Sequence, residues 1–223
     1  MVEQKERELV LKEFDSDSKS GLTEHEAAER LRLYGKNEFE ESKKKTKIQM
    51  FLSQLRDPMI YILGVAVLIS AFLGEYSDSV IIVAVILLNA VIGMVQESKA
   101  EQSLEALKKM SSPLALVRRD GRNIEVPAAD LVPGDIVVLE AGRVVPADLR
   151  LIETVNLKIE ESALTGESVP VDKDAAFVAD GDVTLGDRIN MAYMSTSVSY
   201  GRGEGVVAAT GMNTEIGKIA GMI

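Results

Sequence analysis

Four consecutive residues place a carboxylate next to hydroxyl groups and a glycine, at a point where an apolar alternating run ends. They are Thr165, Gly166, Glu167 and Ser168. A glutamate with an ordinary pKa is ionised at neutral pH, so Glu167 has the charge that a general base needs. Gly166 has no side chain and lets the backbone approach another group closely. The bland alternative for the same four residues is a solvated turn.

Other kinds of chemistry have little to work with. The chain has no cysteine, which excludes disulfides and thiolate metal sites, and its one histidine, His25, falls in the first turn of a predicted helix and should face solvent. We therefore expect no metal site. The net charge of -10 argues against nucleic acid as a partner, because phosphates attract basic surfaces. The polar first fifty residues do not resemble a cleavable signal peptide.

Short apolar runs separated by turn residues predict a β-rich body that carries the Thr165–Ser168 loop. Asp120-Gly121 between two strand-like runs is typical of a hairpin. Further strands are predicted over 136–140 and 149–153, and residues 194–211 predict two strands joined by a turn from Gly201 to Gly205. Such closely spaced strands favour a compact β-sandwich or jelly-roll-like fold. A further helix is predicted to start near Thr214.

A small helical unit is predicted at the N-terminus. Thr23 and Glu26 have the spacing of a capping box, and Gly35 is placed to end the helix. This unit can pack on the β-rich body across the intervening sequence.

Two uncharged apolar runs predict a pair of transmembrane helices over about 58–74 and 79–96. Buried core helices of a soluble protein are the alternative. Lysine and arginine flank the outer ends of the pair, whereas the short connecting loop has only Glu75 and Asp78, so both ends and all polar parts should be cytoplasmic. Small residues four apart, such as Asn89 and Gly93, predict helix packing.

The flanks of the apolar pair also have helical patterns. Residues 48–55 predict an amphipathic interfacial helix, and Pro58 then redirects the chain. The second apolar run continues without glycine or proline to Met110, which predicts one helix of about 48 Å from Ser79. The predicted organisation is an N-terminal helical segment (1–47), the interfacial helix, hairpin and stalk (48–110), and the β-domain (111–223).

Four stretches occur in a telling order: "GLTEHEAAERLRLYGKNEF", "PGDIVVLEAGRVVPAD", "ESALTGESVPV" and "ATGMNTEIGKIA", with the apolar pair after the first. Over almost its whole length the chain resembles the N-terminal part of a P-type cation-transporting ATPase, and it is most similar to the calcium-pump branch. One departure is Arg143, where the family usually has aspartate. The resemblance implies an α+β membrane protein made of a two-helix transmembrane hairpin and a distorted jelly-roll-like actuator domain. The family's phosphorylated aspartate motif is not in this sequence.

The resemblance implies roles for the four residues of the opening motif. In such pumps an aspartyl-phosphate must be hydrolysed: Glu167 would orient and deprotonate the water, Gly166 would allow close approach, and Thr165 and Ser168 would contact the loop and phosphate. ATP and Mg²⁺ would serve the complete pump and not bind to this segment. The implied partners are the lipid bilayer, the phosphorylation and nucleotide-binding domains, the remaining membrane helices and a transported cation.

Calcium is implied by overall resemblance, with Na⁺, K⁺ and H⁺ as alternatives. The implied location is a multi-pass position in a membrane, with the cell membrane favoured and the termini cytoplasmic. A competing hypothesis is a self-standing membrane-anchored regulatory module without catalysis. The apolar ending "IAGMI" favours the pump segment, because it is typical of an interrupted chain.

Overall fold

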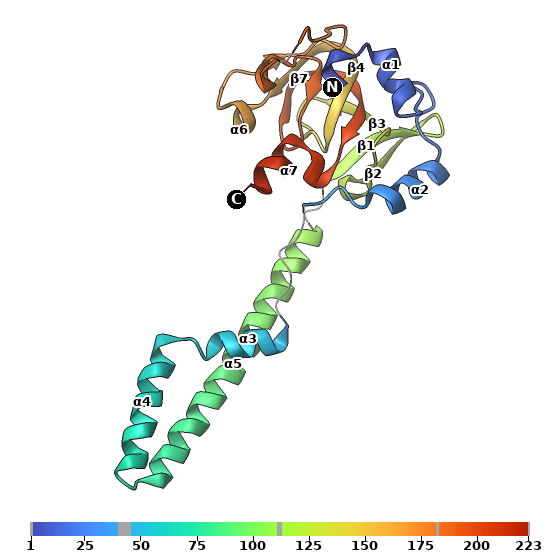
Figure 1. Cartoon of the computed structure of the whole chain (residues 1–223). Coiled ribbons are helices and arrows are strands. Elements are labelled where there is room, and N and C mark those ends of the chain that lie inside the picture. The colour runs from blue at the N-terminus through green and yellow to red at the C-terminus, as the bar shows by residue number, and fades with distance from the viewer. Residues whose placement is uncertain (1, 40–45, 111–112, 182, 223) are drawn as a thin grey trace. The chain divides into compact units, whose positions relative to one another are not determined.

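The computed structural model describes residues 2–39, 46–110, 113–181 and 183–222, with the side chains of 105–110 outside the description (Figure 1). The chain divides into two compact units. Residues Met1–Glu40 and Ser112–Ile223 form the first, here called the β-unit, and Glu41–Ser111 form the second, the helical unit.

The β-unit contains one sheet in which each strand pairs antiparallel with its neighbour. In the described residues the strand order is β2-β1-β3-β7-β4-β5, with β6 also paired to β4. The prediction of a β-rich body is confirmed. The strands are β1 (Leu114–Arg119), β2 (Arg122–Pro127), β3 (Ile136–Glu140), β4 (Asp148–Glu160), β5 (Val171–Asp172), β6 (Met191–Ala192) and β7 (Ser197–Ala209).

The hairpin predicted at Asp120-Gly121 is present. Arg119 pairs with Arg122 across a two-residue turn, and both turn residues have positive φ, 50° at Asp120 and 72° at Gly121. Positive φ at both central residues is what a type I′ turn requires, and the twist of such a turn matches that of the flanking strands. The strand predicted over 136–140 is also found, as β3.

The prediction of two strands joined at Gly201–Gly205 was wrong, because β7 runs unbroken from Ser197 to Ala209 beside β4 (Figure 1). A Cβ on Gly203 would lie 2.8 Å from the Glu153 carbonyl oxygen, and one on Gly201 would lie 2.1 Å from that of Asn156. The register of β4 and β7 shifts along this stretch. The glycines therefore mark close approach of two bulged strands, a second common reason for glycine within a strand.

Alternation along the strands separates two apolar layers. Val137, Leu149 and Val207 belong to the main core cluster on one face of the sheet. Their neighbours Ile136 and Val206 point to the other face and pack with Val10 of α1 (Arg7–Glu13). The β-unit is thus a sheet with its own core on one face and the N-terminal helix α1 on the other.

The N-terminal segment has the caps predicted from the sequence. In α2 (Glu24–Tyr34) the Thr23 hydroxyl accepts a hydrogen bond from Glu26 N, and the Glu26 carboxylate accepts one from Thr23 N. Gly35 ends the helix with a φ of 78°. Ala27 and Leu22 pack on Val132, which ties α2 to the β-unit.

Several short helices complete the β-unit. The helix predicted near Thr214 is α7 (Glu215–Ala220), with Thr214 as its N-cap. The others are η1 (Val2–Gln4), η2 (Ala128–Asp130), α6 (Ser162–Thr165), η3 (Leu185–Asp187) and η4 (Gly211–Asn213).

The helical unit consists of α3 (Lys47–Gln54), α4 (Pro58–Phe72) and α5 (Tyr76–Met110). Pro58 is the first residue of α4, where its missing N–H costs nothing. Helix α3 packs on α5, as Gln54 Nε2 donates to Glu97 Oε2 at 3.1 Å. A Cβ on Gly93 would lie 2.5 Å from Gln54 Oε1, so this glycine admits the α3 side chain.

Only one of the two predicted spans is long enough by itself. Among the described residues Tyr76–Leu104 is the one helix with the length and composition to cross a membrane. Helix α4 has 15 residues, about 22 Å, against a hydrocarbon core of about 30 Å. The span predicted over 58–74 is therefore not confirmed alone. It reaches the required length only together with α3, from which α4 is bent by 65°.

Candidate catalytic loop

The Thr165–Ser168 motif lies in a loop that leaves the sheet at the end of β4 and returns at β5. Helix α6 forms a single turn and ends at Gly166, whose φ of 77° is left-handed. The Gly166 N–H donates to the Ser162 carbonyl at 2.9 Å. No described atom lies within 4 Å of a Cβ built on Gly166, so within this chain the backbone conformation explains the glycine.

Glu167 follows this turn and is exposed, as is Ser168. The threonine hydroxyl organises the turn from inside. Thr165 Oγ1 donates to the Glu161 carbonyl at 3.1 Å and accepts a hydrogen bond from Glu167 N at 3.3 Å. The structure thus brings Thr165, Gly166 and Glu167 into one hydrogen-bonded turn and leaves the Glu167 carboxylate facing outward.

A buried ion pair lies at the base of this loop. Lys173 Nζ is 2.6 Å from Glu161 Oε1, and both side chains have 0% exposure. Burial raises the pKa of Glu161 and lowers the pKa of Lys173, while their mutual attraction opposes both shifts. The sequence analysis missed this pair. Two opposite charges bracketing a loop are the only local signal, and they do not reveal burial.

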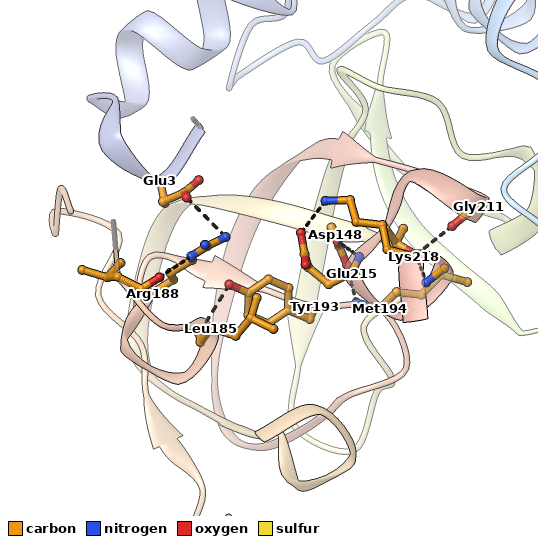
Figure 2. Close-up of polar contacts among 12 residues, drawn as sticks. Glu3, Asp148, Leu185, Arg188, Tyr193, Met194, Gly211, Glu215 and Lys218 are labelled. Atoms are coloured by element: carbon orange, nitrogen blue, oxygen red, sulfur yellow. Dashed lines mark hydrogen bonds and ion pairs between the residues drawn. The ribbon is translucent and has the colours of Figure 1, made fainter. Parts of the chain in front are cut away.

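Asp148, at the end of the "PAD" stretch, is a structural anchor for α7. Its carboxylate accepts hydrogen bonds from Met194 N at 2.8 Å and from Glu215 N at 2.7 Å, and Figure 2 shows it between the two. Burial is the main cause of its raised pKa, and the hydrogen bonds act in the opposite direction. In the same region Lys218 Nζ is 2.6 Å from Glu215 Oε1.

Arg143, the departure from the family pattern, is accommodated at the surface. Its guanidinium is 3.1 Å from a Glu125 carboxylate oxygen and 3.5 Å from one of Glu140. Among the described residues, no group of three or more His, Asp or Glu side chains is placed to hold a metal ion. The side chain of His25 is 81% exposed.

Two family models match the chain. The model of the P-type ATPase actuator domain matches residues 109–223. The model of the N-terminus of cation transporters and ATPases matches residues 2–70. The first match alone includes more than half of the chain.

The chain belongs to the P-type ATPases.

This P-type ATPase segment is 56% identical over 223 residues to calcium-transporting ATPase 1 of Bacillus cereus, covering 98% of the chain and 25% of that protein. It is 48% identical to a calcium-transporting ATPase of Bacillus subtilis, and the match covers 96% of the chain and 24% of that protein. It is 44% identical to the cation-transporting ATPase pma1 of Synechocystis, and the match covers 96% of the chain and 23% of that protein. The chain therefore spans about a quarter of the length of these relatives.

Proposed function

We propose that this P-type ATPase segment is the actuator part of an ATP-driven cation pump, and that its loop promotes hydrolysis of the pump's aspartyl-phosphate. The observation that supports this most directly is the exposed Glu167 carboxylate on a turn fixed by Thr165 and Gly166. An acceptor that serves a phosphate on another domain has to be exposed in its own domain.

The proposed step is a hydrolysis that this loop completes from outside the phosphorylated domain. Water oxygen attacks phosphorus, the bond from phosphorus to the aspartate oxygen breaks, and Glu167 takes the water proton. The products are the free aspartate carboxylate and inorganic phosphate. Gly166 has no side chain and so keeps the approach to the phosphate open. Ser168 is exposed next to Glu167, and its hydroxyl contacts the phosphate. Thr165 holds the turn.

The complete pump would use ATP and Mg²⁺ on its phosphorylation and nucleotide-binding domains. We infer Ca²⁺ as the transported ion, because two of the relatives above are named calcium-transporting ATPases. Another relative is named only for cation transport, which keeps other cations as outcomes of an ion-dependence measurement.

We also propose that the apolar parts of the helical unit are embedded in the bilayer, with the apolar part of α5 as one span and the bent pair α3–α4 as the other. In the most apolar stretch of α5, within Tyr76–Leu104, only 11% of the stretch is buried. On α4, Met59, Leu68 and Phe72 are 67%, 71% and 92% exposed. A core helix of a soluble protein would bury these side chains, whereas lipid stabilises them.

The proposed orientation places the short α4–α5 connection outside and the β-unit in the cytoplasm, in the cell membrane. In this proposal residues 1–47 and 97–223 form the cytoplasmic part, with the stalk over 97–110 and the jelly-roll-like actuator domain over 111–223. The absence of native cysteine allows a direct test. In intact cells an impermeant thiol reagent should label Ser77→Cys and not Ser199→Cys, two exposed positions. The opposite result would invert the topology.

The function is tested by Glu167→Gln in the complete pump. The phosphoenzyme should still form from ATP, because the loop does not build the ATP site. Its decay during a chase with unlabelled ATP should slow by about 10²- to 10⁴-fold, the usual loss for a positioned base. Glu160→Gln, an exposed carboxylate at the end of β4, is the control and should decay like the parent. Parent-like decay of Glu167→Gln would refute the proposed role.

A further inference from the structure

The two residues that bracket the catalytic loop are joined to each other below it. Glu161 is the last residue before α6, and Lys173 follows β5 directly. The loop between them is largely exposed, yet the two charged groups have 0% exposure and are 2.6 Å apart. The ion pair therefore closes the base of the loop.

Glu161 is connected to the catalytic turn through its backbone as well. Its carbonyl oxygen accepts hydrogen bonds from Leu164 N at 2.9 Å and Thr165 N at 3.0 Å, and from Thr165 Oγ1 at 3.1 Å. The same hydroxyl accepts the hydrogen bond from Glu167 N. A shift of Glu161 would thus move the turn that carries the Glu167 carboxylate.

Lys173 holds the returning end of the loop. Its backbone N–H donates to the Leu157 carbonyl on β4 at 2.9 Å, and its ammonium lies 5.8 Å from the ring centre of the buried Tyr193. Among the described residues, the charged atoms of Glu161 and Lys173 have no further hydrogen-bond partner. Each charge is therefore compensated chiefly by the other, which restricts the pair to one geometry.

We propose that Glu161 and Lys173 are positioning residues for dephosphorylation: their buried ion pair holds the catalytic loop so that Glu167 meets the aspartyl-phosphate. This inference rests on the function proposed above. It predicts that the pair controls the rate of phosphoenzyme decay without contacting the phosphate itself. Charged side chains on a protein surface often serve only solubility. That explanation does not apply to Glu161 and Lys173, because both side chains are removed from water.

The test compares Glu161→Gln, Lys173→Met and the double variant in the complete pump, with phosphoenzyme decay after an ATP chase as the readout. Each single variant leaves one buried charge unpaired and should slow decay by about 10- to 100-fold, as a displacement of about 1 Å does in active sites. The double variant has no unpaired charge, so it should decay faster than either single variant.

The decay constant separates positioning from folding. It is measured only on molecules that have been phosphorylated, so a loss of folded protein lowers the amplitude and leaves the rate constant unchanged. The matched control is Lys158→Met, which removes an exposed ion pair between β4 and β5, the strands that lead into and out of the loop, with Lys158 Nζ 2.9 Å from Asp172 Oδ1. This variant should decay like the parent.

Parent-like rate constants in both single variants, with slow decay in Glu167→Gln, would overturn the positioning role and leave the proposed function standing. Parent-like decay in Glu167→Gln itself would overturn both. If a single variant forms no phosphoenzyme, Glu161→Asp keeps the charge and shortens the side chain by one methylene. Slow decay of Glu161→Asp would support the proposal, and a parent rate would overturn it.

Discussion

Arg119 and Asp135 form a two-point ion pair inside the β-unit. Arg119 Nε is 2.8 Å from Asp135 Oδ1 and Nη2 is 2.6 Å from Oδ2, with side-chain exposures of 10% and 0%. Asp135 Oδ2 also accepts the Val132 N–H at 3.0 Å. The contact joins the end of β1 to the loop before β3, so the "PGD" aspartate has a structural role away from the Thr165–Ser168 loop.

We expect Asp135→Ala to lower the free energy of unfolding by about 3–5 kcal/mol, because it leaves the Arg119 charge buried and unpaired. Glu204→Ala, which removes the neighbouring and more exposed pair with Arg118, is the control and should cost less. Chemical unfolding of the detergent-solubilised chain, followed by tyrosine near-ultraviolet circular dichroism, measures both. Equal losses would show that burial does not set the strength of the Arg119–Asp135 pair.

Gly203→Ala should destabilise the β-unit by about 1–3 kcal/mol, because its Cβ would lie 2.8 Å from the Glu153 carbonyl oxygen. Gly186→Ala is the matched control. The Cβ there would meet Thr165 Cγ2 at 3.5 Å, an ordinary contact, and φ is not positive. The same unfolding measurement applies. A neutral Gly203→Ala would mean that β4 and β7 separate at this bulge without cost.

Asp148 should make stability depend on pH in a defined direction. Burial raises its folded-state pKa above the ordinary 3.8, so between 3.8 and the raised value the folded state binds more protons than the unfolded state. Its contribution is fully present below pH 3.8 and is lost as pH rises through the raised pKa. The free energy of unfolding of the parent, minus that of Asp148→Asn, should therefore fall as the pH rises through that window. A difference that stays constant with pH would contradict the raised pKa.

The continuous helix α5 allows a mechanical prediction for the complete protein, which follows from the pump function proposed above. Seven glycines inserted after Ser103 should uncouple ATP hydrolysis from transport, because each glycine costs about 1 kcal/mol of helix stability relative to alanine. Seven alanines in the same place add close to two helical turns. They keep the helix stiff and leave the side chains on either side of the insertion on nearly the same helix faces as before. Transport per ATP should fall for the glycine insertion and remain higher for the alanine insertion. Normal coupling with seven glycines would reduce α5 to a tether.

Local patterns determined much of this fold in advance. The Asp120-Gly121 turn, the Thr23–Glu26 capping box and the start of a helix near Thr214 depend on residues within a few positions of each other, so the sequence predicted them and the structure confirms them. The order of the sequence motifs likewise indicated the P-type ATPase family, and the matches to two family models support that assignment. The motif also drew attention to Glu167, whose catalytic role stays a prediction.

Tertiary structure decided what local patterns could not. Gly203 in a glycine-rich run is compatible with a turn or with a close strand contact, and only the approach of β4 made it the latter. Helix α4 ends at Phe72, so its apolar run depends on the bent α3 to reach membrane length. Glu161 and Lys173 are both fully buried, and the ring of Tyr193, some twenty residues further along the chain, lies near the Lys173 ammonium. A charged residue in a sequence does not reveal such burial, because the groups that cover it come from elsewhere in the chain.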